Sequence, residues 1–237
     1  METRTPSTID VDIGTLGRPV KSKNHLVTFD PFDRHLVREK YERLPFAVSP
    51  FDAEGGNATF YINRDEPACS SMLGINPAFR RNATLVHERA STCQPSRVFS
   101  TGKLFGYVVR CRDPRHLEVS SVPTIRLSTF LTQRKVRHIN WIKVDAQGAD
   151  LAIVEDLLTR TSVTLGHMTA ECQDLQKAPP LYLDNSLPLN DCAALVALAR
   201  RHRPHGFDRV EYSWSNSCAA EHNVQLWWNV SAPLDMG

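Results

Sequence analysis

Two carboxylates of this sequence stand at the ends of strand-like segments, where such groups can orient a ligand or accept a proton. The apolar run Ile139–Val144 stops at Asp145, and a small-residue turn then opens a helical pattern over Gly148–Thr159. The later segment Val163–Glu171 also terminates at a carboxylate. Because α/β sheets bind ligands just beyond the carboxyl ends of their strands, Asp145 is the first candidate residue. The simpler alternative is that Asp145 only caps the helix.

A glycine turn follows the first strand-like segment. Residues Ser7–Ile13 form a β-branched run that contains Asp12 and meets Gly14 and Gly17. Glycines at such a point let backbone amides approach a ligand closely, as nucleotide-type cofactors require. A short glycine pattern is also typical of an ordinary tight turn, so this site needs support from the rest of the chain.

A third acid ends the second segment. His25–Phe29 is predicted to be a strand, and Asp30 follows it directly, with Pro31 preventing a smooth continuation. A carboxylate at this point can accept hydrogen bonds from both hydroxyls of a ribose. Alternatively, Asp30 caps a helix that we expect around Arg34–Arg43.

The remaining pattern indicates one α/β domain. We expect a third strand over Phe46–Ser49, an edge hairpin between this strand and Asn57–Asn63, and an irregular excursion from Arg64 to about Leu117. The rest of the chain predicts strand Val119–Ile125, a short helix from Leu127, a helix over Cys192–His202, and an antiparallel pair of strands, Phe207–Trp214 and Asn223–Val230. These elements add up to a mixed seven-stranded sheet with helical crossovers.

The composition limits the binding partners and the cellular location that we expect for this protein. With 28 Lys and Arg against 26 Asp and Glu, the chain lacks the strong positive field that would hold nucleic acid or an anionic membrane. No apolar run approaches the roughly 18 residues of a membrane-spanning helix, and the polar start Met1–Ser7 lacks the apolar core of a signal peptide. We therefore expect a soluble cytoplasmic protein with six reduced cysteines. We take the glycosylation acceptor patterns at Asn57, Asn82 and Asn229 to be chance matches.

Together, these features resemble the FkbM family of class I S-adenosylmethionine-dependent methyltransferases. The family's most specific signature, Ile-Lys-Ile-Asp-x-Glu-Gly-x-Glu, is similar to Ile142-Lys-Val-Asp-Ala-Gln-Gly-Ala-Asp150, and Glu171 matches the acid that closes the next strand. Its opening Asp-Gly motif resembles Asp12–Gly17, and its Phe/Glu-Pro turn resembles Phe29–Pro31. Further matches are Ala47–Ser49, Gly56–Tyr61, the serine pair Ser70-Ser71, and Gly206-Phe207.

The resemblance implies a fold. We expect a three-layer α/β/α sandwich around a Rossmann-like mixed sheet with strand order 3-2-1-4-5-7-6, whose last strand is antiparallel. Residues 1–237 would form this single domain, with the irregular insertion at about 64–117. Only ten residues separate Gly14 from His25, so we expect the first crossover helix to be cropped or absent.

The resemblance also implies a function, which is methyl transfer from S-adenosyl-L-methionine to a hydroxyl of a small molecule or a sugar. It predicts cofactor binding by Asp12, Gly14, Gly17, Asp30, Ser49 and Asp145, and catalysis by Asp145 and Glu171. We predict no metal, nucleic acid or membrane partner, and the acceptor and the oligomeric state are left open.

One departure motivates an alternative from another class. Gln147 stands where the family has a glutamate, so a second negative charge beside Asp145 is lost unless Asp150 or Glu171 supplies it. This change and the short first crossover suggest a non-catalytic binding module on a degenerate methyltransferase scaffold. An NAD-dependent oxidoreductase would use the same glycine turn, but it explains neither the segment around Asp145 nor the antiparallel final strands.

Overall fold

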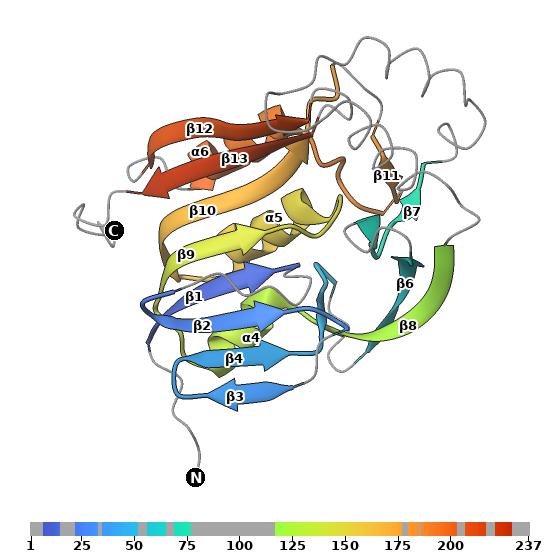
Figure 1. Cartoon of the computed structure of the whole chain (residues 1–237). Coiled ribbons are helices and arrows are strands. Elements are labelled where there is room, and N and C mark those ends of the chain that lie inside the picture. The colour runs from blue at the N-terminus through green and yellow to red at the C-terminus, as the bar shows by residue number, and fades with distance from the viewer. Residues whose placement is uncertain are drawn as a thin grey trace.

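The chain is organised around an eight-stranded mixed sheet (Figure 1). The structure is a computed structural model, and it describes residues 7–14, 22–32, 35–51, 56–64, 69–76, 117–176, 180–184, 186–202, 207–216 and 221–228. The strand order is β12-β13-β10-β9-β1-β2-β4-β3, in which β4, β2, β1, β9 and β10 run parallel. The bounds of these strands are β1 Thr8–Ile13, β2 His25–Phe29, β3 Leu36–Arg38, β4 Tyr41–Leu44, β9 His138–Val144, β10 Thr164–Gln173, β12 Phe207–Asn216 and β13 Glu221–Trp228.

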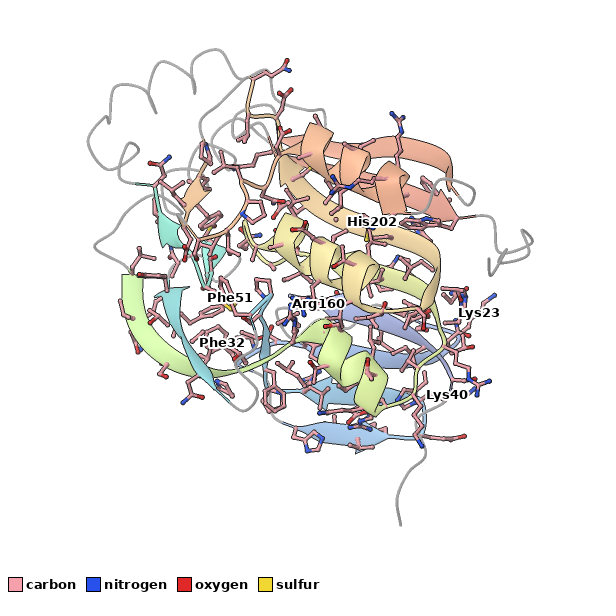
Figure 2. The ribbon with its side chains drawn as sticks, turned by 180° about the vertical axis from the view of Figure 1, so that it is seen from behind. Lys23, Phe32, Lys40, Phe51, Arg160 and His202 are labelled. Atoms are coloured by element: carbon pink, nitrogen blue, oxygen red, sulfur yellow. A yellow bond between two sulfur atoms is a disulfide. The ribbon has the colours of Figure 1, made fainter. Side chains whose placement is uncertain are left out.

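Three helices cover one face of this sheet. They are α4 (Leu127–Gln133), α5 (Asp150–Arg160) and α6 (Cys192–His202), and they lie behind the sheet in Figure 1 and in front of it in Figure 2. Successive side chains of a strand point to opposite faces, so every second strand residue reaches the helices. The largest apolar core forms there, and Ile142 of β9 and Leu195 of α6 are fully buried in it.

The other face of the central strands is polar. Asp10 and Asp12 alternate with the apolar residues of β1, and Lys143 alternates with those of β9. Asp10 accepts hydrogen bonds from Ser22 and from the Asn24 and Asn140 amides, so its burial is matched by donors. The described helices leave this face uncovered, and the second helical layer of the expected sandwich remains a prediction. The first crossover, residues 15–21, lies outside the described part of the chain.

Two small sheets flank the carboxyl ends of the parallel strands. One has the order β5-β8-β6, with β5 at Ala47–Val48, β8 at Leu117–Ile125 and β6 at Asn57–Asn63. The other pairs β7 (Gly74–Ile75) with β11 (Tyr182–Leu183). This second pair brings two segments together that are about a hundred residues apart in the sequence, and it places Tyr182 near the end of β9. Most of the expected insertion at 64–117 lies outside the described residues.

The edge of the sheet next to β2 differs from the predicted structure. The helix expected around Arg34–Arg43 is wrong, because β3 and β4 form an antiparallel hairpin there. In β4, Glu42 and Leu44 are buried while their neighbours are half-buried, which is the two-residue period of a strand. The hairpin therefore adds an antiparallel edge strand to the sheet.

The expected third strand, Phe46–Ser49, is also misplaced. β4 lies beside β2, while β5 pairs with β8 in the small sheet. The predicted hairpin between this strand and Asn57–Asn63 is wrong as well, since β8 lies between β5 and β6. Pro45 separates β4 from β5, which lets the chain leave the main sheet at this point.

A disulfide joins Cys172, at the end of β10, to Cys192, at the start of α6, with their Cα atoms 5.0 Å apart. The expectation of reduced thiols is therefore wrong for this pair, because spacing in the sequence does not show which cysteines meet in the fold. The antiparallel pairing of β12 with β13 agrees with the prediction for the final strands. No described helix is long and apolar enough to cross a membrane.

Candidate functional site

Four residues stand at one level across the carboxyl edge of the parallel strands. The register pairs Phe29 of β2, Ile13 of β1, Val144 of β9 and Ala170 of β10 with one another. The residues that come next along these four strands are Asp30, Gly14, Asp145 and Glu171, respectively. Adjacent strands lie about 4.8 Å apart, so these positions form a row at a single edge of the sheet.

Gly14 brings the turn after β1 into contact with the end of β9. Its φ angle is +81°, which favours glycine, and its N–H donates to the Phe29 carbonyl at 3.0 Å. A Cβ atom at this position would lie 2.0 Å from the carbonyl oxygen of Asp145. Only glycine therefore fits between the turn and Asp145. Gly17 lies outside the described residues.

Asp12, Lys143 and Asp145 form a charged group on the polar face of the sheet. The Lys143 Nζ atom lies 2.9 Å from Oδ2 of Asp145 and 3.9 Å from Oδ1 of Asp12, which is almost fully buried. Burial works to lower the pKa of Lys143, but the carboxylates of Asp145, Asp12 and Glu171 outweigh it and hold that pKa above its usual value. Lys143 is thus a fixed positive charge beside the candidate catalytic carboxylate.

Gln147 joins the two carboxylates that the sequence singles out for catalysis. Its Nε2 atom donates to Oδ1 of Asp145 at 2.7 Å and to Oε2 of Glu171 at 2.8 Å. An amide nitrogen carries two hydrogens, so both are used on charged acceptors. A glutamate at this position would bring a third negative charge in place of two donors. The departure from the family pattern therefore has a structural role, which is to hold Asp145 and Glu171 side by side.

The conformation of Gln147 is itself tightly held. Its φ angle is +51°, in the left-handed region that residues other than glycine seldom adopt. The Ser71 hydroxyl donates to its carbonyl oxygen at 2.8 Å, and the Tyr182 hydroxyl lies 3.0 Å from its side-chain oxygen. Such backbone outliers persist where surrounding contacts over-determine them, and they cluster at functional sites.

Asp150 fixes the loop between β9 and α5. Its carboxylate, fully buried, accepts the N–H groups of Ala146 at 2.9 Å and Gly148 at 3.0 Å, and the Asn190 amide at 3.1 Å. Burial, with the nearby charge of Asp145, raises the pKa of Asp150 to about 7 despite these donors. Its protonation therefore changes near neutral pH, one loop away from Asp145.

Asp30 stands at the β2 end of the row, and Ser49 follows β5 in the small sheet. Oδ1 of Asp30 accepts the N–H of Phe32 at 3.0 Å, which closes a turn after β2, while no described residue donates to Oδ2. Ser49 accepts the N–H of Phe51 at 3.1 Å and is buried at the end of β5. Within the described residues, no contact links Ser49 to Asp145 or Glu171.

Comparison with known proteins identifies the family of this chain. The model of the methyltransferase FkbM domain matches residues 19–179, which is more than half of the chain. The chain belongs to the FkbM methyltransferase family. Searches of curated proteins and of solved structures found no match.

The matched segment of this FkbM domain contains Asp30, Lys143, Asp145, Gln147 and Glu171, whereas Asp12 and Gly14 precede it. The family assignment and the row of strand ends therefore rest on largely the same residues. Within the described part of the chain, no cluster of three or more His, Cys, Asp or Glu residues could hold a metal ion.

The sequence did not reveal two residues that organise the site. Tyr182 lies in a segment of the sequence without a readable motif, and it reaches Gln147 only because β11 pairs with β7. Asn190 lies just before the predicted helix Cys192–His202, and its amide donates to Asp150 at 3.1 Å and to the Glu171 carbonyl at 3.2 Å. Both contacts join positions at least 19 residues apart, so no local pattern predicts them.

Proposed function

We propose that this FkbM domain transfers a methyl group from S-adenosylmethionine to a hydroxyl oxygen of a small molecule or a sugar. The observation that carries the proposal is the row of strand ends, in which one amide nitrogen holds Asp145 and Glu171 together beside the glycine turn. α/β sheets bind their ligands at this edge.

The residues at the row suit this cofactor chemically. Oδ2 of Asp30 has no donor among the described residues and would accept a ribose hydroxyl, while Oδ1 is committed to the turn. Gly14 keeps the backbone of the first turn free of side-chain atoms. The carboxyl groups of Asp12, Asp145 and Glu171 outnumber the single ammonium of Lys143, which favours a cationic ligand. S-adenosylmethionine supplies an electrophilic methyl group on a positively charged sulfonium.

Asp145 is the residue proposed to receive the acceptor's proton. The side chain of Asp145 is 29% exposed, so an acceptor can reach it. Gln147 and Lys143 fix the direction of its two carboxylate oxygens. Each carboxylate oxygen has two acceptor sites, so an acceptor hydroxyl can still donate to one of them. Glu171 would orient the acceptor from the neighbouring strand, and positioning of this kind supplies most of the rate in such a transfer.

The direct test follows label from methyl-labelled S-adenosylmethionine into a panel of sugars and small hydroxylated acceptors, with the product identified as a methyl ether. Asp145→Asn should lower turnover by about two to four orders of magnitude. Glu155→Gln, an exchange at an exposed position of α5, is the control and should leave turnover unchanged. A labelled amine or carbon product would contradict oxygen methylation. Equal turnover of Asp145→Asn and the parent would contradict the proposed proton acceptor.

A further inference from the structure

The three cysteines within the described residues are all engaged in disulfides. Cys172 and Cys192 bond to each other, and Cys69 is also disulfide-bonded. All three are buried, with 0% exposure for Cys172. Disulfides persist in oxidising compartments and are rare in the cytosol, where thiol reductants keep cysteines reduced. The fold itself therefore argues for a compartment different from the expected cytoplasm.

One glycosylation acceptor pattern lies on a described strand. Asn57, Ala58 and Thr59 begin β6, and the side chains of Asn57 and Thr59 are exposed. β6 is an edge strand of its three-stranded sheet; its outer edge is paired at Tyr61, by Ser71, while no described strand pairs with Asn57 or Thr59 on that side. The pattern Asn-x-Ser/Thr needs this kind of exposed site in order to carry a bulky sugar. The other two patterns, at Asn82 and Asn229, lie outside the described residues.

The described residues beside Asn57 on its face of the sheet are also exposed. Asn57 pairs with Pro123, and Thr59 pairs with Ser121, both exposed residues of β8. The next residue on this outer face is Val119, whose exposure is 62%.

We propose that this chain folds in an oxidising, glycosylating compartment and that Asn57 carries an N-linked glycan. The disulfide and the exposed acceptor are independent observations that the same compartment explains. The proposal replaces the cytoplasmic location and the chance match at Asn57, which the sequence alone predicts.

Two covalent steps are involved. The two thiols of Cys172 and Cys192 lose two protons and two electrons to a disulfide oxidant, which is reduced to two thiols. At Asn57, the amide nitrogen bonds to the anomeric carbon of an oligosaccharide donated by a lipid pyrophosphate. The bond from that carbon to the pyrophosphate oxygen breaks, the pyrophosphate leaves with the electron pair, and one amide proton is released.

The test is a peptide map of the chain recovered from its own source cells, digested without reduction after free thiols have been blocked. Glycan release by an amidase in heavy-oxygen water should leave labelled aspartate at position 57. The peptides of Cys172 and Cys192 should be joined. An unmodified Asn57, or blocked thiols at Cys172 and Cys192, would overturn the proposal.

Matched variants check the acceptor itself in a eukaryotic secretory host. Thr59→Ser keeps the hydroxyl and should be glycosylated, whereas Thr59→Val keeps the β-branched shape, removes the hydroxyl and should leave Asn57 bare. Both changes lie on the exposed face of β6, so both proteins should fold. Glycan at Asn57 in Thr59→Val, or none in the parent, would show that this pattern is not the acceptor.

Discussion

Replacing Gln147 by glutamate tests the bridge between the two carboxylates most sharply. The exchange removes two charge-assisted donors, at 2.7 and 2.8 Å from carboxylate oxygens, and puts a third carboxylate in their place. Two like charges about 4 Å apart repel by about 4 kcal/mol at an effective dielectric constant of about 20. Because the side chain of Asp145 is 29% exposed, solvent screens much of this repulsion. We therefore expect Gln147→Glu to lower the free energy of unfolding by about 2–4 kcal/mol at pH 8.

The cost should depend on pH in a defined direction. Repulsion raises the pKa of the new carboxyl in the folded state above its unfolded value of about 4.3, so the folded protein binds the extra proton more tightly. The penalty is then complete above the folded pKa and is lost as the pH falls below the unfolded pKa. A cost of 2–4 kcal/mol lowers the melting temperature by about 4–16 °C for a chain of this size.

The assay is the melting temperature of parent and variant from pH 4 to pH 8. Gln147→Met is the matched control, since it has a similar shape and loses the donors without adding charge. Its deficit should stay nearly constant from pH 8 to pH 6, whereas that of Gln147→Glu should already shrink over this interval and further toward pH 4. A pH-independent deficit for Gln147→Glu, or none at pH 8, would refute the bridging role.

Four further outcomes follow from the same structure. Asp30→Asn keeps the hydrogen bond to the Phe32 N–H but removes the negative charge of the side chain. Titration should therefore show S-adenosylmethionine binding weakened by about ten- to a hundredfold, while the melting temperature stays unchanged. An undiminished affinity would show that Asp30 is not part of the cofactor site. Asp145→Asn should bind the cofactor within a few-fold of the parent while its kcat falls, and a loss confined to KM would contradict a proton-accepting role. The paired change of Cys172 and Cys192 to alanine removes a crosslink between positions 20 residues apart, which should cost about 3 kcal/mol and about 6–12 °C in melting temperature; equal stability would mean that the crosslink does not form. Burial raises the pKa of Asp150 from 3.8 to about 7, so the parent should lose stability relative to Asp150→Asn as the pH rises through that interval, and a constant difference would contradict the raised pKa.

The parallel core of the fold could be predicted because its strands are continuous apolar runs. β1, β2, β9 and β10 each agree with a predicted segment to within about three residues, and α6 spans Cys192–His202 as expected. Gly14, Asp30 and Asp145 directly follow β1, β2 and β9, whereas Glu171 lies level with them inside β10, which continues to Gln173. The row at the carboxyl edge therefore follows from the direction and register of the strands.

The edges of the fold could not be predicted in the same way. β3 and β4 are short and half-exposed, and the charged residues Arg38, Glu42 and Arg43 hide the two-residue period. Glu42 is buried, and Arg134, the residue after α4, donates to it at 2.9 Å, a contact across 92 residues. Tertiary contacts of this kind override local preference.

Contacts between residues far apart in the sequence also determine the role of Gln147. The change to Gln147 first indicated a lost charge, because the sequence does not show that its amide lies between Asp145 and Glu171. The Cys172–Cys192 crosslink closes the chain segment that contains Tyr182, which in turn contacts Gln147. The crosslink therefore restrains the support of the site as well as the fold.

Whether the row at the carboxyl edge binds S-adenosylmethionine can be measured by calorimetric titration of the folded parent chain with that cofactor. We predict saturable binding of one cofactor per chain, with a Kd of roughly 1–100 μM, near the substrate concentrations at which enzymes commonly work. A folded protein that shows no binding of S-adenosylmethionine up to millimolar concentration would contradict the account.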